Sequence, residues 1–181
     1  MNDYDSIKGI FLKKKSLTSE FTQNAFSFES NNDYYQAKKC YDEALSQDIE
    51  VSDLERDLWE ESLLRCCNEL TEWKEMYNYT THEKDLHSLF TEDSYSLEYL
   101  FPYAFRSKLK IILQGDIDEQ EKHRDLIDFV QKLDSDGKKY LEQAYCLEMA
   151  LINLHQKDFN AAKYFAHIAI QKYLMVNNIN K

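Results

Sequence analysis

The sequence contains very little glycine and proline. Of 181 residues, three are glycine and one is proline. Sandwiches, barrels and dinucleotide-binding folds need many special turns, which so few of these residues cannot supply. Hydrophobic residues make up 43% and aromatic residues 14%, which is too apolar for an intrinsically disordered chain. The composition therefore predicts a folded, all-α protein.

Long apolar runs and an excess of positive charge are also lacking. The longest aliphatic run, residues 111–113, is far shorter than the ~20 residues of a membrane-spanning helix. The 22 basic residues face 33 acidic ones, and this net charge of -11 disfavours DNA binding, which depends on lysine and arginine. The four cysteines have no disulfide-framework spacing, which predicts a reducing compartment, cytosol or nucleus. No direct nucleic-acid or membrane partner is expected.

The acidic residues are concentrated in one part of the chain. Nine carboxylates between Asp42 and Glu61 face a single base, Arg56. A solvated acidic face is the main interpretation, and a docking face for a basic partner is the alternative. In residues 138–181, six lysines face three acids, so this end of the sequence is weakly basic.

Apolar residues recur with a helical period along most of the chain. Thr18 and Asp33 are expected N-caps, and Asp53 is expected to open a long helix. A short helix around residues 73–77 is followed by an expected extended loop at 78–94. Further helices are predicted at 102–114, 118–133, 138–156 and 159–177, with a first short stripe at residues 4–11. Pro102 suits the first position of its helix, Gly115 suits the C′ position, and Gly137 is expected to break the chain.

Two segments share one helical register. Asp33-Tyr34-x-x-Ala37-x-x-x-Tyr41-x-x-Ala44-Leu45 aligns with Asp158-Phe159-x-x-Ala162-x-x-x-Ala166-x-x-Ala169-Ile170. The pattern is typical of the second helix of a tetratricopeptide repeat, in which small residues let antiparallel helices approach to ~8–10 Å. Any helical-hairpin protein is the alternative. The predicted structural positions, mostly helix crossings, are Phe21, Ala25, Phe28, Ala37, Tyr41, Ala44, Leu45, Pro102, Gly115, Ala150, Ala162 and Ala169.

These patterns predict an all-α, TPR-like or HEAT-like helical-repeat solenoid built from antiparallel helix pairs. We expect one segment, residues 1–181. Its first helical block is residues 1–77, with a repeat unit at 18–47, and the loop at 78–94 follows. The second block is residues 95–181, with a repeat unit at 140–176. The sequence between the two units, around Trp59 and Trp73, departs from the repeat pattern.

Three groups of residues imitate chemical sites. His123-Arg124-Asp125-Leu126 spells a kinase catalytic loop, but Val130 stands where its metal-binding asparagine belongs, and no glycine-rich phosphate loop is present. Cys66 and Cys67 are adjacent, whereas structural zinc sites space their cysteines by two to four residues. These cysteines, with His82 and His87, are therefore not expected to bind zinc. The basic residues at 106, 108 and 110 are expected to pair with acids rather than bind phosphate. No catalytic, cofactor-binding or metal-binding residue is predicted.

Four stretches carry a family resemblance. They are residues 3–11 (DYDSIKGIF), 41–45 (YDEAL), 70–74 (LTEWK) and, most specifically, 99–115 (YLFPYAFRSKLKIILQG). Together and in this order they resemble the FAT region of the phosphatidylinositol-3-kinase-related protein kinases, in particular the member that repairs double-strand breaks. The resemblance implies a helical solenoid that braces the kinase domain, and it implies that Met1 lies inside a longer chain.

The resemblance also implies a cellular setting. The parent would be a nuclear serine/threonine kinase of end joining that uses ATP and Mg, whereas this segment would need no cofactor. Its partners would be its own kinase domain and the neighbouring solenoid, with Ku and DNA bound only by other parts of the parent. The alternative is an independent tetratricopeptide adaptor, but the ring of groove-facing Lys, Arg and Asn expected of an adaptor is not found in the sequence.

Overall fold

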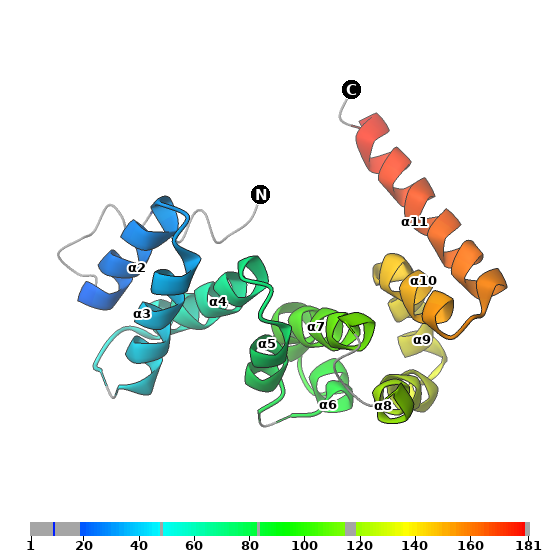
Figure 1. Ribbon diagram of the computed structural model, residues 1–181, viewed down its shortest axis with the longest axis horizontal. Coiled ribbons are helices and arrows are strands. Elements are labelled where there is room, and N and C mark those ends of the chain that lie inside the picture. The colour runs from blue at the N-terminus through cyan, green and yellow to red at the C-terminus, as the bar shows by residue number, and fades with distance from the viewer. Residues whose placement is uncertain (1–8, 10–18, 48, 83, 115–118, 180–181) are drawn as a thin grey trace. The chain divides into compact units, whose positions relative to one another are not determined.

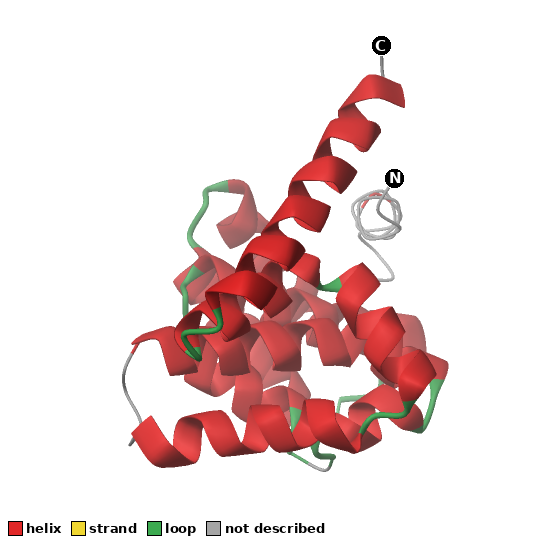
Figure 2. Ribbon diagram, turned by 90° about the vertical axis from the view of Figure 1, so that its right-hand side faces the viewer, coloured by secondary structure: helices red, strands yellow, loops and turns green. Residues whose placement is uncertain are grey.

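The computed structural model describes residue 9 and residues 19–47, 49–82, 84–114 and 119–179. All regular secondary structure in these ranges is helical, without strands (Figure 2), so the predicted all-α helical-repeat class is confirmed for them. Apart from residue 9, the expected first stripe at residues 4–11 lies outside the described residues, as do Thr18 and Gly115. By its internal contacts the chain divides into two compact units, residues 1–76 and residues 77–181.

The described part of the first unit contains the consecutive helices α2 (Glu20–Ser30), α3 (Tyr34–Ser46) and α4 (Asp53–Glu69). Helix α3 packs against α2 on one side and α4 on the other (Figure 1). Asp33 caps α3 as predicted, because its carboxylate accepts the Gln36 N–H at 3.2 Å. Ser19 caps α2 and Ser52 caps α4, which begins at Asp53 as expected. Helix α5 (Trp73–Thr80) then leads toward the second unit.

The core of the first unit combines small residues of two helices with large residues of the third. Ala25 of α2 and Ala37, Tyr41 and Ala44 of α3 are each fully buried. The α4 residues packed with them are Trp59, Leu63 and Cys66. Small residues on α2 and α3 bring the helix axes close together, and the indole ring then fills the space beside them.

The second unit contains α6 (Leu86–Thr91), a π-helical turn η2 (Ser96–Leu100), α7 (Phe101–Gln114), α8 (Glu119–Lys132), α9 (Ser135–Ala144), α10 (Cys146–His155) and α11 (Phe159–Ile179). Its core includes a cluster of aromatic rings among aliphatic side chains. The rings of Phe101 and Phe105 stack with centroids 5.3 Å apart, and Tyr145 meets both edge-on at 5.6 and 5.3 Å. Such contacts add to the free energy gained by burying the rings. Helix α10 packs against α11.

Two expectations about this unit are wrong. The stretch 78–94 is not an extended loop, because α5 continues to Thr80 and α6 occupies residues 86–91. A six-residue helix is too short for its apolar period to be visible in the sequence. The expected helix 138–156 is interrupted at Tyr145, whose backbone lies outside the helical region (φ -121°, ψ 38°) while its ring enters the aromatic core.

The single proline and one glycine also differ from expectation. Pro102 does not open a separate helix: α7 continues directly from η2, and the Phe101 N–H bonds to the Ser96 carbonyl, five residues back. The wider turn accommodates a proline that has no N–H of its own to donate. Gly137 lies in the first turn of α9 and donates its N–H to Asp134. A Cβ there would lie 3.2 Å from the Phe90 ring, so close packing rather than a chain break explains this glycine.

Across the described residues, no helix has both the length and the apolar composition required to cross a membrane.

Candidate functional site

The kinase-like motif has the wrong backbone for a catalytic loop. His123, Arg124 and Asp125 lie inside the 14-residue helix α8. The run Asp134-Ser135-Asp136-Gly137 forms the N-cap and first turn of α9, with the Asp134 carboxylate bonded to the Gly137 N–H at 2.7 Å. A catalytic loop must present its aspartate from an irregular segment beside bound nucleotide, and both motifs are helical instead.

One hollow of the second unit is small and open. It has a volume of about 200 Å³ and is formed by α5, α6 and α8 of the second unit. The side chains that line it are Tyr77, Asp85, Leu86, His87, Asp128, Phe129 and Lys132. Pockets for drug-sized ligands usually exceed about 300 Å³ and are mostly apolar, so this hollow does not have the form of a cofactor site.

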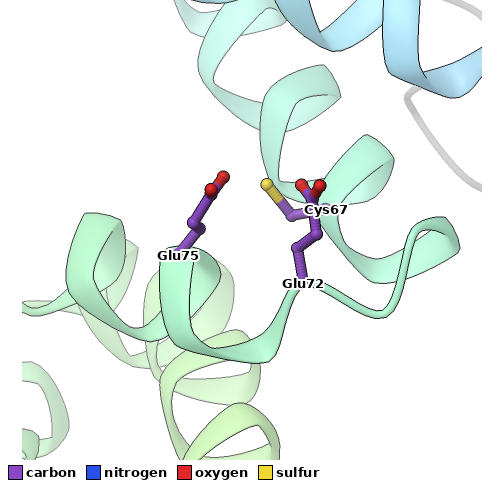
Figure 3. A group of neighbouring side chains, drawn as sticks. All are labelled: Cys67, Glu72 and Glu75. Carbon is purple, nitrogen blue, oxygen red and sulfur yellow. The ribbon is translucent and has the colours of Figure 1, made fainter.

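One cluster brings possible metal ligands together. Cys67 at the end of α4 and the carboxylates of Glu72 and Glu75 place ligand atoms within 4.8 Å of one another (Figure 3). The Lys38 ammonium bonds both carboxylates, at 2.5 Å in the case of Glu72. A cation is thus already supplied by the protein itself. His82 and His87, considered with the cysteines in the sequence, belong to the second unit and not to this group.

The protonation of the cluster supports a structural role. Burial, reinforced by the neighbouring carboxylates, raises the pKa of the Cys67 thiol to about 12, although Lys38 opposes this shift. Burial lowers the pKa of the Lys38 ammonium, but its bonds to Glu72 and Glu75 outweigh this and raise the pKa above the ordinary value. A metal needs a thiolate, and this thiol holds its proton. The cluster therefore joins α3 to the start of α5 through an ion pair.

The raised thiol pKa predicts a specific pH dependence of stability. An unfolded thiol ionises near pH 9 and the native Cys67 thiol near pH 12, so the native state holds the extra proton in this range. Wild type should then lose unfolding free energy between these values, by about 2 kcal/mol at about pH 10.5, relative to Cys67→Ala. Urea unfolding of both proteins at pH 8 and 10.5 measures the difference. A gap between them that stays constant would contradict the shift.

A buried carboxylate connects α2 to α4. Glu55 is only 2% exposed. Its Oε1 accepts the Ser19 N–H at 2.9 Å and the Thr22 hydroxyl at 2.5 Å, and the Thr22 oxygen in turn accepts Nε1–H of Trp59 at 2.6 Å. The sequence predicted a solvated acidic face. Glu55 belongs to this stretch but is buried, so the prediction does not hold for it. A charge buried in this way is tolerated because each partner satisfies it with a hydrogen bond.

A second buried carboxylate connects α2, α3 and α4. Glu29 of α2 accepts the Tyr41 hydroxyl of α3 at 2.8 Å and a guanidinium N–H of Arg65 of α4 at 2.6 Å. Its side chain is 2% exposed and that of Arg65 is 31% exposed. Neither carboxylate was predicted to be buried. Glu55 lies four residues before Trp59, and Glu29 lies four residues after Ala25, so their helical register with buried positions was the available signal.

The predicted structural positions differ in burial. Ala25, Ala37, Tyr41 and Ala44 are fully buried, and Ala150 and Ala162 are 7% exposed. Phe21, Phe28 and Leu45 are partly buried against the core of the first unit. Pro102 and Ala169 are also partly buried. The positions in the first unit thus lie deeper than those of the closing helix pair.

The basic residues of α7 do not form a continuous cationic face. Lys108 is 8% exposed, and its ammonium lies 5.0 Å from the centre of the Tyr77 ring. Arg106 pairs with Glu148 at 2.8 Å and lies over the Tyr145 ring, so the predicted pairing with an acid is confirmed for this residue. A phosphate would have to displace these contacts.

No protein-family model matches the chain. The DNA-dependent protein kinase catalytic subunits of Gallus gallus and Mus musculus are 37% and 36% identical to it over 186 aligned residues, which cover 96% of the chain. The subunit of Dictyostelium discoideum is 26% identical over 176 residues. The chain spans only about 4% of the length of these relatives. The resemblance inferred from the sequence is confirmed, and it concerns one short segment of a much longer protein.

Proposed function

We propose, from the similarity of nearly the whole chain to the DNA-dependent protein kinase catalytic subunit, that it is a FAT-type scaffold segment of such a kinase. The observation that carries the proposal is a match over 96% of this chain to 4% of the relative. A segment of this kind contributes shape and stiffness rather than catalytic groups. Three features support this role. The helices pack in hairpins, the kinase-like motif lies inside helix α8, and Lys38 occupies the acidic cluster of Glu72 and Glu75.

The scaffold would brace the kinase domain and pass on conformational change. Packed helices joined by buried polar networks move as units, because breaking one contact leaves charges unsatisfied. The Glu29 and Glu55 networks tie α2, α3 and α4 in this way. In this proposal the parent acts in the nucleus in end joining of double-strand breaks. ATP and Mg, and also Ku and DNA, are bound by other parts of the parent.

The bracing role is tested in the full-length kinase with a variant that strains one helix contact. Ala37 is fully buried between helices, so Ala37→Leu should overpack the contact and cost about 1–3 kcal/mol. We expect the DNA-stimulated phosphorylation rate to fall several-fold, while the Michaelis constant for ATP stays unchanged because the nucleotide site is elsewhere. Lys39→Leu, on the exposed side of the same helix, is the matched control.

Two outcomes would count against the scaffold. An unchanged rate in an Ala37→Leu enzyme with a lowered melting temperature would show that this segment does not brace the kinase domain. Saturable ATP–Mg binding by the 181-residue chain in calorimetry would show that it holds a nucleotide site itself.

A further inference from the structure

Two tyrosine rings are stacked on the surface of the second unit. The ring centroids of Tyr95 and Tyr99 are 5.3 Å apart with an interplanar angle of 28°, and the two residues are 48% and 47% exposed. The pair lies at the π-helical turn η2, and such turns are rare and occur mostly at functional sites. Tyrosine is enriched at protein interfaces because its ring is apolar and its hydroxyl is polar. The stacked pair is therefore a candidate contact surface.

A carboxylate next to the pair has an unbalanced charge. Glu98 is exposed, and within the described part of the chain it forms no hydrogen bond or ion pair. The nearby acids Glu92 and Asp93 are instead paired with the Lys84 ammonium, at 2.9 and 3.0 Å. Charge complementarity at this turn therefore calls for a cation at Glu98.

The same short pattern already holds an arginine elsewhere in the second unit. Residues 95–98 and 145–148 share the pattern Tyr-x-Leu-Glu, and in both the tyrosine is the N-cap of its helix without a side-chain capping bond. Arg106 of α7 donates Nε–H to Glu148 at 2.8 Å, and its guanidinium carbon lies 5.6 Å from the centre of the Tyr145 ring. The pattern thus supplies a carboxylate and an aromatic ring to one guanidinium.

The two copies of the pattern differ in what packs against the tyrosine. Tyr145 is 5% exposed, because its ring enters the core beside Phe101 and Phe105, and its arginine comes from the same unit. Tyr95 packs against Tyr99 at the surface instead. The surface copy is accessible to a cation from another molecule.

We propose that Tyr95, Glu98 and Tyr99 form a recognition site for an arginine side chain in a basic segment of a partner protein. The guanidinium packs against the tyrosine pair and donates to the Glu98 carboxylate, as Arg106 does in the other copy of the pattern. Arginine suits the site better than lysine, because its planar cation stacks on aromatic rings while its fork of N–H groups bonds a carboxylate. A basic segment also complements the net charge of -11.

Fluorine NMR of the 181-residue chain labelled with 3-fluorotyrosine tests the site, with an acetylated and amidated GGRGG peptide as the probe. The variants Tyr95→Phe and Tyr99→Phe assign the two signals. We expect both signals to shift saturably with a dissociation constant of roughly 1–10 mM, since a single exposed contact of this kind is weak. Tyr164, which is 60% exposed on α11 beside Lys163, is the internal control and should not shift.

Two altered peptides test the chemistry of the probe. Citrulline has nearly the shape of arginine but no charge, so its peptide should bind at least about ten-fold more weakly. The lysine peptide keeps the charge but lacks the planar fork, so it should bind at least about three-fold more weakly.

A pair of matched variants tests the carboxylate. Glu98→Gln keeps the size of the side chain and should weaken binding of the arginine peptide by about three- to ten-fold. Glu69→Gln, which changes an exposed glutamate of the first unit, should leave the binding unchanged.

Four results would overturn the proposal. Equal binding of the citrulline peptide would indicate stacking without charge, and equal binding of the lysine peptide would indicate a general preference for cations. Unchanged binding to Glu98→Gln would remove the carboxylate from the site. The absence of a saturable shift up to about 50 mM peptide would show that the tyrosine pair does not bind arginine. None of these results bears on the bracing role, which Ala37→Leu tests separately.

Discussion

Replacing Trp59 by alanine should lower the free energy of unfolding of the first unit by about 3–5 kcal/mol, since the change removes a large, fully buried ring. The indole lies in the core with Ala37, Tyr41 and Ala44, whose small or fixed side chains cannot move in to fill the cavity. The ring also donates Nε1–H to Thr22 at 2.6 Å. The loss therefore combines a cavity with a broken polar network.

Two further variants separate these contributions. Trp59→Phe keeps most of the ring but leaves the Thr22–Glu55 pair without its indole donor, so it should cost about 1–3 kcal/mol. Leu54→Ala, on the same helix and 47% exposed, should stay within about 0.5 kcal/mol of wild type. Urea unfolding followed by circular dichroism measures all three. A loss below 1 kcal/mol for Trp59→Ala would mean that α4 does not cover α3 as described.

The fold follows from local signals in the sequence wherever one helix period extends over three or more turns. Asp33 and Asp53 mark helix starts that are present in the structure. Four positions of the predicted repeat register are fully buried, namely Ala25, Ala37, Tyr41 and Ala44. These signals succeed because capping and close helix approach depend on the side chain at one position and its neighbours in the same helix.

The missed features depend on residues distant in the sequence. Glu55 and Glu29 look like solvated acids until Thr22, Tyr41 and Arg65 are brought to them from other helices. Gly137 is explained by the Phe90 ring, which packs against it from a different helix. No local pattern encodes such encounters. From the sequence alone, Glu55 was therefore assigned to a solvated face and Gly137 to a chain break, and Glu29 received no assignment.

The candidate sites are motifs that suggest chemistry in the sequence but do not form a site in the structure. His123-Arg124-Asp125 has the composition of a catalytic loop, yet the apolar period around it continues through the motif and forms α8. Cys67 was considered with histidines of the second unit, whereas its actual neighbours are Glu72, Glu75 and Lys38 of the first unit. A motif predicts chemistry only when the backbone that presents it is also predicted.

The second large effect concerns the buried pair of Glu29 and Arg65. Removing the guanidinium with Arg65→Leu leaves a carboxylate that is 2% exposed without its charged partner, which should destabilise the first unit by about 3–5 kcal/mol. Because the Arg65 side chain is 31% exposed, solvent screens part of its interaction with Glu29. The expected destabilisation therefore lies at the lower end of this range. Arg106→Leu, which removes an arginine that is 56% exposed, should cost at most about 1 kcal/mol.

The double variant Glu29→Leu/Arg65→Leu distinguishes loss of the pair from loss of packing. Removing both charges eliminates the unpaired carboxylate, so the double variant should be more stable than Arg65→Leu alone by at least about 1 kcal/mol, although the Tyr41 hydroxyl then loses its acceptor. Denaturant unfolding of the wild type, both single variants and the double variant gives the coupling energy directly. Strictly additive single effects would mean that the two side chains do not interact, and that the hydrogen bonds of Glu29 do not hold α2 to α4.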